Sequence, residues 1–96
     1  MTKHELLRVL REHRRELEAF GVKSLALFGS VAGDEAGPES DVDLLVEFRE
    51  PVGLFRFLDV KAYLESLLQR EVDLVTPDAL KRQLREAILR EAVRAL

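Results

Sequence analysis

Two short segments of this 96-residue chain carry the residue types of a phosphate and metal site. The apolar run Leu27-Phe28 breaks at Gly29-Ser30, and ten residues separate this pair from Asp41 and Asp43. Side chains two positions apart in a strand point to one face, roughly 6.6 Å apart, so the two aspartates are expected side by side. Neighbouring carboxylates repel each other, and a divalent cation such as Mg2+ relieves that repulsion.

The Gly29-Ser30 pair supplies the other half of this chemistry. Small residues let backbone N–H groups approach a phosphate closely, and such groups bind anions. The sequence therefore predicts a phosphate group, as in a metal-bound nucleotide, held between the Gly-Ser turn and a cation on the aspartates. In the simpler alternative, Asp41 and Asp43 belong to a solvated strand face with Glu47, and Gly29 only ends a strand.

The elements that position these residues alternate along the chain. Thr2 and Glu5 form a capping box, which predicts a helix that ends near Gly21. Further signals predict strands over 24–28, 42–48 and 71–75, a short helix from Val31-Ala32, a helix from Pro51 and a last helical region after Thr76-Pro77. This order, α-β-α-β-α-β-α, is typical of a small α/β (α+β) fold with helices packed on a sheet.

The helical segments carry apolar stripes that are expected to face the core. They comprise Leu6, Leu10, Leu17 and Phe20, then Phe57, Val60, Leu64 and Leu67, then Leu80, Leu84, Ile88 and Val93. The last region is apolar around its whole circumference, because Leu89, Ala92 and Leu96 lie outside its stripe. We expect part of that surface to dock a partner or a second copy of the chain.

The third expected strand adds one more acid. Val72 and Leu74 are predicted to face the core, and Asp73 to face the opposite side. Asp73 taken alone could equally begin a turn or pair with Arg70. Together with Asp41 and Asp43, it makes a third carboxylate on the same small sheet.

The composition limits the class of protein. A chain of 96 residues that is 47% hydrophobic suits a single domain over 1–96. The absence of cysteine excludes disulfides and thiolate metal sites. No apolar run approaches a membrane span and no signal peptide is visible, so we expect a soluble, cytoplasmic protein with no membrane partner. The net charge of −3, with acids gathered between Asp34 and Glu50, argues against direct nucleic-acid binding.

Three segments together resemble the minimal nucleotidyltransferases (MNT domains) of the superfamily with the DNA polymerase β palm fold. They are Phe28-Gly29-Ser30, Ser40-Asp41-Val42-Asp43-Leu44-Leu45-Val46 and Val72-Asp73-Leu74-Val75-Thr76-Pro77. The resemblance extends over most of the chain, from residue 5 to residue 93. It implies a palm-like fold built on a mixed sheet of three strands or slightly more.

The resemblance also implies a role for each site residue. Gly29 and Ser30 would hold the β- and γ-phosphates of ATP. Asp41 and Asp43 would bind one or two Mg2+ ions, and Asp73 would join the metal that activates the acceptor hydroxyl. The implied reaction is the transfer of AMP to a hydroxyl of a partner protein, with release of pyrophosphate. That partner would be the HEPN-domain toxin of a HEPN/MNT toxin–antitoxin pair.

The loop after Gly29-Ser30 departs from the family pattern. Many members carry a basic residue at the position of Gly33 and a glycine at that of Asp34, so this chain lacks a cation that could meet the triphosphate. One lost charged hydrogen bond costs on the order of 1.5–3 kcal/mol of phosphate binding. The alternative function is therefore a non-catalytic antitoxin with a weakened nucleotide site, which neutralises its partner by contact alone.

Overall fold

The computed structural model describes residues 2–29 and 41–96. Within these ranges the strands form a four-stranded mixed sheet in the order β3-β2-β1-β4. The strands are β1 (Val22–Phe28), β2 (Val42–Phe48), β3 (Val72–Val75) and β4 (Val93–Arg94). β2 pairs antiparallel with β1 and parallel with β3, and β4 pairs antiparallel with β1. The α/β class is confirmed, and the short helix predicted from Val31-Ala32 lies outside the described residues.

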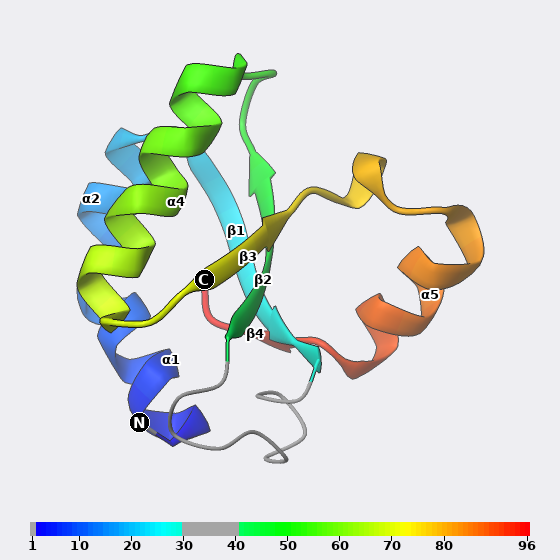
Figure 1. The fold of residues 1–96 in the computed structure, drawn as a ribbon, viewed down its shortest axis with the longest axis horizontal. Helices are drawn as coiled ribbons and strands as arrows, with labels where there is room; N and C mark the ends of the chain where they lie inside the picture. The colour runs from blue at the N-terminus through cyan, green and yellow to red at the C-terminus, as the bar shows by residue number, and fades with distance from the viewer. Residues whose placement is uncertain (1, 30–40) are drawn as a thin grey trace.

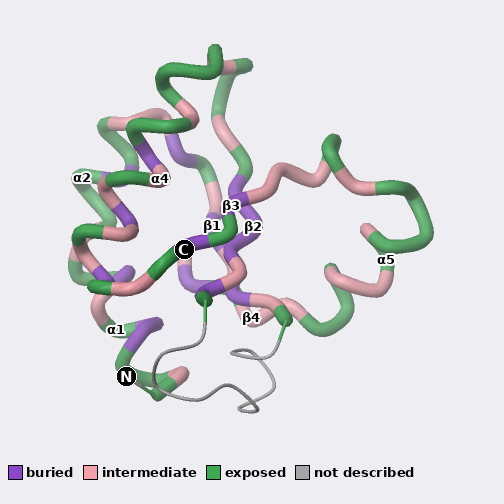
Figure 2. The backbone as a smooth tube through the Cα atoms, viewed as in Figure 1, coloured by how far each residue is buried: buried purple, intermediate pink, exposed green. Residues whose placement is uncertain are grey.

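Helices cover the two faces of this sheet unequally. Figure 1 shows α1 (Lys3–Glu12), α2 (Arg14–Ala19) and α4 (Leu54–Leu68) on one side and α5 (Arg82–Glu91) on the other. The core lies between the sheet and the three helices α1, α2 and α4 (Figure 2). Its residues include Leu6, Leu10, Leu17, Leu25, Leu27, Val42, Leu44, Val46, Val60, Leu64 and Leu68. In the described part of the chain, none of the helices has the length and apolarity that a bilayer span requires.

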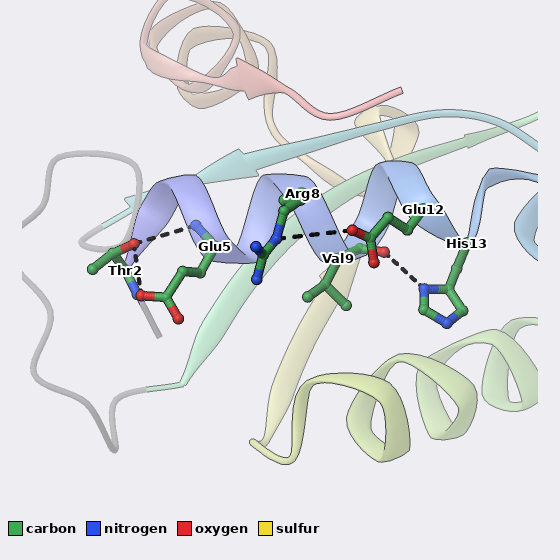
Figure 3. Close-up of polar contacts among 6 residues, drawn as sticks. All are labelled: Thr2, Glu5, Arg8, Val9, Glu12 and His13. Carbon is green, nitrogen blue, oxygen red and sulfur yellow. Dashed lines mark hydrogen bonds and ion pairs between the residues drawn. The ribbon is translucent and has the colours of Figure 1, made fainter.

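The predicted first helix is two helices, because the chain breaks at His13. The capping box at its start is confirmed, since Thr2 Oγ1 accepts a hydrogen bond from Glu5 N at 3.2 Å (Figure 3). His13 Nδ1 lies 2.8 Å from the Val9 carbonyl oxygen, which the His13 N–H would bond in a continuous helix. That N–H bonds to Leu10 instead, at 3.2 Å. A side chain thus competes with the backbone, and α1 ends there.

The start of α4 is three residues later than predicted. Pro51 does not begin the helix, because Gly53 is its extended N-cap and Leu54 is its first residue. A helix from Pro51 would place Gly53 inside its first turn, where glycine costs about 0.5–1 kcal/mol relative to alanine. Glycine is well tolerated at the N-cap. The predicted inward stripe is confirmed, with Val60, Leu64 and Leu68 buried and with Phe57 and Leu67 partly buried.

The C-terminal region differs most from its prediction. Thr76-Pro77 begins a short 3-10 helix, η1 (Pro77–Ala79), and α5 starts only at Arg82. Every residue of α5 is half-buried or exposed, and the predicted inward Leu84 is 53% exposed. Val93 is not helical, because it pairs with Leu27 as part of β4. Docking of a partner on this region stays a prediction.

An arginine from α1 holds the short strand β4 in place. Arg11 donates from Nε to the Ala95 carbonyl and from a terminal nitrogen to the Arg94 carbonyl, each at 3.1 Å. On the other side, Ala95 N donates to the Leu25 carbonyl of β1 at 2.8 Å. Because β4 has only two residues, these flanking contacts supply much of its attachment.

We therefore expect Arg11→Ala to lower the free energy of unfolding by about 1–2 kcal/mol, since it leaves two carbonyls without their charged donor. Urea unfolding measures this loss. Arg8→Ala is the control, because Arg8 makes an exposed ion pair with Glu12 at 3.9 Å, which contributes little. Equal losses in the two variants would contradict the role given to Arg11.

Candidate functional site

The sheet brings the three predicted aspartates to one end of the β2–β3 pair. Asp43 on β2 and Asp73 on β3 are register partners, so their side chains leave the same face, opposite the core. Asp41 lies one residue before β2. Asp41 and Asp73 line a hollow of about 500 Å3 at this end, together with Lys61, Glu65, Glu71 and Val72.

The Gly29 backbone lies directly against the Asp43 side chain. Phe28, the last residue of β1, is the register partner of Asp43, and Gly29 follows it with φ +71°. A Cβ at Gly29 would overlap Asp43 Oδ2 and lie 3.1 Å from its Cγ. Glycine is therefore required twice, by the backbone angle and by the neighbouring carboxylate. The predicted phosphate-binding residue Ser30 lies outside the described residues, as do Gly33 and Asp34.

The electrostatics of the site disfavour the charged form of the Asp43 carboxyl group. Partial burial raises the pKa of the Asp43 carboxyl above its ordinary value, and the charges of Asp73 and Asp41 raise this pKa further. The folded chain then binds more protons than the unfolded chain at pH values between the ordinary and the raised pKa. The contribution of Asp43 to stability therefore falls as pH rises through that window and stays low at neutral pH.

The donor atoms suit a hard cation that is shared with a ligand. Mg2+ prefers oxygen ligands and is commonly held by one or two carboxylates together with phosphate oxygens and water. Within residues 2–29 and 41–96, no three acidic or histidine side chains form a ready-made metal cage. Asp41, Asp43 and Asp73 supply carboxylate oxygens, which are ligands of the kind that such a cation takes.

One residue at this site was missed by the sequence analysis. Glu65 on α4 lines the same hollow, and its Oε2 accepts a hydrogen bond from Val72 N at 3.0 Å. That hydrogen bond lowers the pKa of the Glu65 carboxyl. Glu65 also pairs with Lys61, at 3.5 Å, and this is the signal visible in the sequence. An i,i+4 pair of this kind is ordinary on a helix surface, so it gave no indication of a role.

Comparisons with known proteins agree with the fold. The family model of the nucleotidyltransferase domain matches residues 7–96. Protein adenylyltransferase MntA of Thermococcus cleftensis is 43% identical over 94 residues, covering 97% of this chain and 95% of that protein. A solved structure of a candidate minimal nucleotidyltransferase is 41% identical, covers 97% of this chain and 95% of its own, and superposes with a TM-score of 0.82.

A more distant solved structure shows the same fold. It is the complex of a tri-AMPylated Shewanella oneidensis HEPN toxin with an MNT antitoxin, and its matching chain is 17% identical with a TM-score of 0.67. The match covers 94% of this chain and 71% of that one. This chain therefore belongs to the nucleotidyltransferase domain family, among its minimal members, and is a nucleotidyltransferase enzyme.

We expect Gly29→Ala to be less stable than Gly21→Ala. Both glycines have positive φ, so each substitution costs about 1–2 kcal/mol of backbone strain. A Cβ at Gly21 meets nothing within 4 Å, whereas one at Gly29 meets the Asp43 carboxylate. Urea unfolding of the two variants separates the contact from the strain. A Gly29→Ala loss no larger than the Gly21→Ala loss would show that Asp43 moves aside freely.

We expect Asp43→Asn to raise the urea midpoint of the metal-free protein at pH 7, because it removes a partly buried charge and the repulsion of that charge by Asp73 and Asp41. The gain should shrink toward pH 4, where Asp43 itself is increasingly protonated. Unfolding curves in chelator-treated buffer at the two pH values measure it. Asp59→Asn, on the exposed surface of α4, is the control. A gain that does not depend on pH would contradict the electrostatic cause.

Proposed function

We propose that this chain is the antitoxin of a HEPN/MNT pair and transfers AMP from ATP to a hydroxyl of its HEPN-domain partner in the cytoplasm. The observation that carries the proposal is the register between β2 and β3. It sets Asp43 beside Asp73, with Asp41 on the same hollow and the Gly29 backbone against Asp43. Three acids and a close-approach glycine at one end of a sheet are what a metal-bound triphosphate requires.

The relatives support this choice of donor and acceptor. The Thermococcus cleftensis protein, 43% identical to this chain, is named a protein adenylyltransferase. Among structures that share the fold, the HEPN toxin of Shewanella oneidensis is tri-AMPylated in its complex with an MNT antitoxin. Another such toxin–antitoxin structure contains AMP-PNP, an analogue of ATP. These three observations concern those proteins, and they favour ATP as the donor and a HEPN-domain partner as the acceptor for this chain.

Each site residue has a distinct task in the proposed reaction. Asp41 and Asp43 would hold one or two Mg2+ ions, and Gly29 with Ser30 would receive the β- and γ-phosphates on backbone N–H groups. Bound Mg2+ supplies Lewis-acid activation of the acceptor hydroxyl and charge neutralisation at the leaving pyrophosphate. Asp73 completes the site on the acceptor side, where its exposed carboxylate can pass the hydroxyl proton to solvent.

The bond changes balance as a single displacement. The acceptor oxygen forms a bond to the α-phosphorus, while the bond from that phosphorus to the oxygen bridging it to the β-phosphate breaks. The products are AMP esterified to the partner and free pyrophosphate. The site residues position charge and form no covalent intermediate, so catalysis depends on where β2 and β3 hold the three carboxylates.

We expect the wild-type chain, mixed with its HEPN partner, to transfer label from ATP labelled at the α-phosphate and none from ATP labelled at the γ-phosphate. Asp41→Asn and Asp43→Asn should each reduce transfer by at least about a hundredfold, because each removes a metal ligand. Circular dichroism should show both variants folded.

The control is Asp59→Asn, which should transfer at the wild-type rate. If the Asp41→Asn, Asp43→Asn double variant neutralised the partner as well as the wild type does, the antitoxin would act by contact and not by AMP transfer. Label retained from the γ-phosphate would identify a kinase and would contradict the proposed reaction.

A further inference from the structure

Strand β3 is an edge strand, and one of its outward amides is satisfied by a side chain. In the sheet formed by the described residues, β3 has a strand neighbour on one side, β2. Val42 N donates to the Glu71 carbonyl at 2.9 Å, so that carbonyl faces β2. Bonded positions alternate along a strand, and the Val72 N–H therefore faces away from β2. Glu65 Oε2 accepts its hydrogen bond, at 3.0 Å.

Glu65 also spans the connection from α4 to β3. Its backbone carbonyl accepts a hydrogen bond from Gln69 N at 2.9 Å, where the left-handed conformation of Gln69 ends the helix. Its carboxylate accepts from Val72, the first residue of β3. One residue therefore closes the helix and begins the strand, across the connecting residues 69–71. Leu64 and Leu68, on either side of Glu65, are buried and fix this end of α4 in the core.

We propose that Glu65 is a positioning residue for Asp73, because it holds the amide of the residue immediately before that aspartate. Asp73 and Glu65 line the same hollow, while the Val72 side chain is buried on the opposite side of the strand. The hydrogen bond thus sets where β3 presents Asp73 to the cation and the acceptor. The inference rests on the proposed function, which makes Asp73 a site residue.

Glu65 acts through its carboxylate oxygen, and its side chain is long enough to bring that oxygen from α4 to the Val72 N–H. The same Oε2 that accepts from Val72 N lies 3.5 Å from Lys61 Nζ, so it is already engaged by two donors. A role as a further metal ligand would have to break these contacts. Reach and charge can be separated experimentally, because aspartate keeps the charge and shortens the side chain, whereas glutamine keeps the length and loses the charge.

The test compares Glu65→Asp with Glu65→Gln in the full chain. Three quantities are measured: amide hydrogen exchange at Val72 and Asp73 without metal, the dissociation constant of Mn2+, and the rate of AMP transfer to the HEPN partner. In Glu65→Asp we expect exchange at Val72 to be about tenfold faster and Mn2+ binding about tenfold weaker, with transfer reduced in proportion. Glu65→Gln should stay within about twofold of the wild type, because its amide oxygen still accepts from Val72 N.

Glu12→Asp is the matched control, since Glu12 belongs to another helical i,i+4 pair, at 3.9 Å from Arg8, and should leave all three quantities unchanged. A Glu65→Asp variant with wild-type exchange and Mn2+ affinity would overturn the inference. A Glu65→Gln variant that loses as much as Glu65→Asp would also overturn it, because charge would then be the acting feature. A wild-type chain that binds Mn2+ but transfers no AMP would refute the proposed function alone, since exchange and Mn2+ affinity would still decide the role of Glu65.

Discussion

The parallel register of β2 with β3 is the constraint on which the site depends. It sets Asp43 beside Asp73, although like charges at neighbouring positions repel each other. The register is held from the other side of the sheet, where Val42, Leu44 and Val72 are buried in the core. A slip of one residue would turn every one of these side chains to the wrong face. Burial of the core residues therefore offsets the unfavourable repulsion between Asp43 and Asp73, and a bound cation would relieve that repulsion.

The remaining contacts at the site refine what this register sets. Gly29 follows β1 without a Cβ and so leaves room for the Asp43 carboxylate, and Glu65 holds the first amide of β3 from α4. Each contact lies on a different element, so β1, β2, β3 and α4 all contribute to one small region. The geometry of these four elements therefore sets where the site residues lie.

Local signals in the sequence predicted much of this arrangement. The capping box at Thr2, the limits of β2 and the opposed faces of Val72 and Asp73 depend on neighbouring residues and strand alternation, and the structure has them as expected. The errors came from contacts across the chain or from side chains that compete with the backbone. The ring of His13 breaks a helix by bonding to a carbonyl, and Val93 joins a strand only because Leu27 is its partner. The first contact is local but depends on the rotamer of one side chain, and the second joins residues that are far apart in the sequence.

The most direct test is anomalous diffraction from crystals of the chain grown with Mn2+ and a non-hydrolysable ATP analogue. If the aspartates form one nucleotide and metal site, the manganese peak will lie on the carboxylates of Asp41 and Asp43, with Asp73 beside it and the triphosphate against Gly29. Manganese bound away from these aspartates, or a nucleotide bound elsewhere without metal, would contradict the site. Either of those results would leave contact with a partner as the better explanation of the proposed antitoxin role.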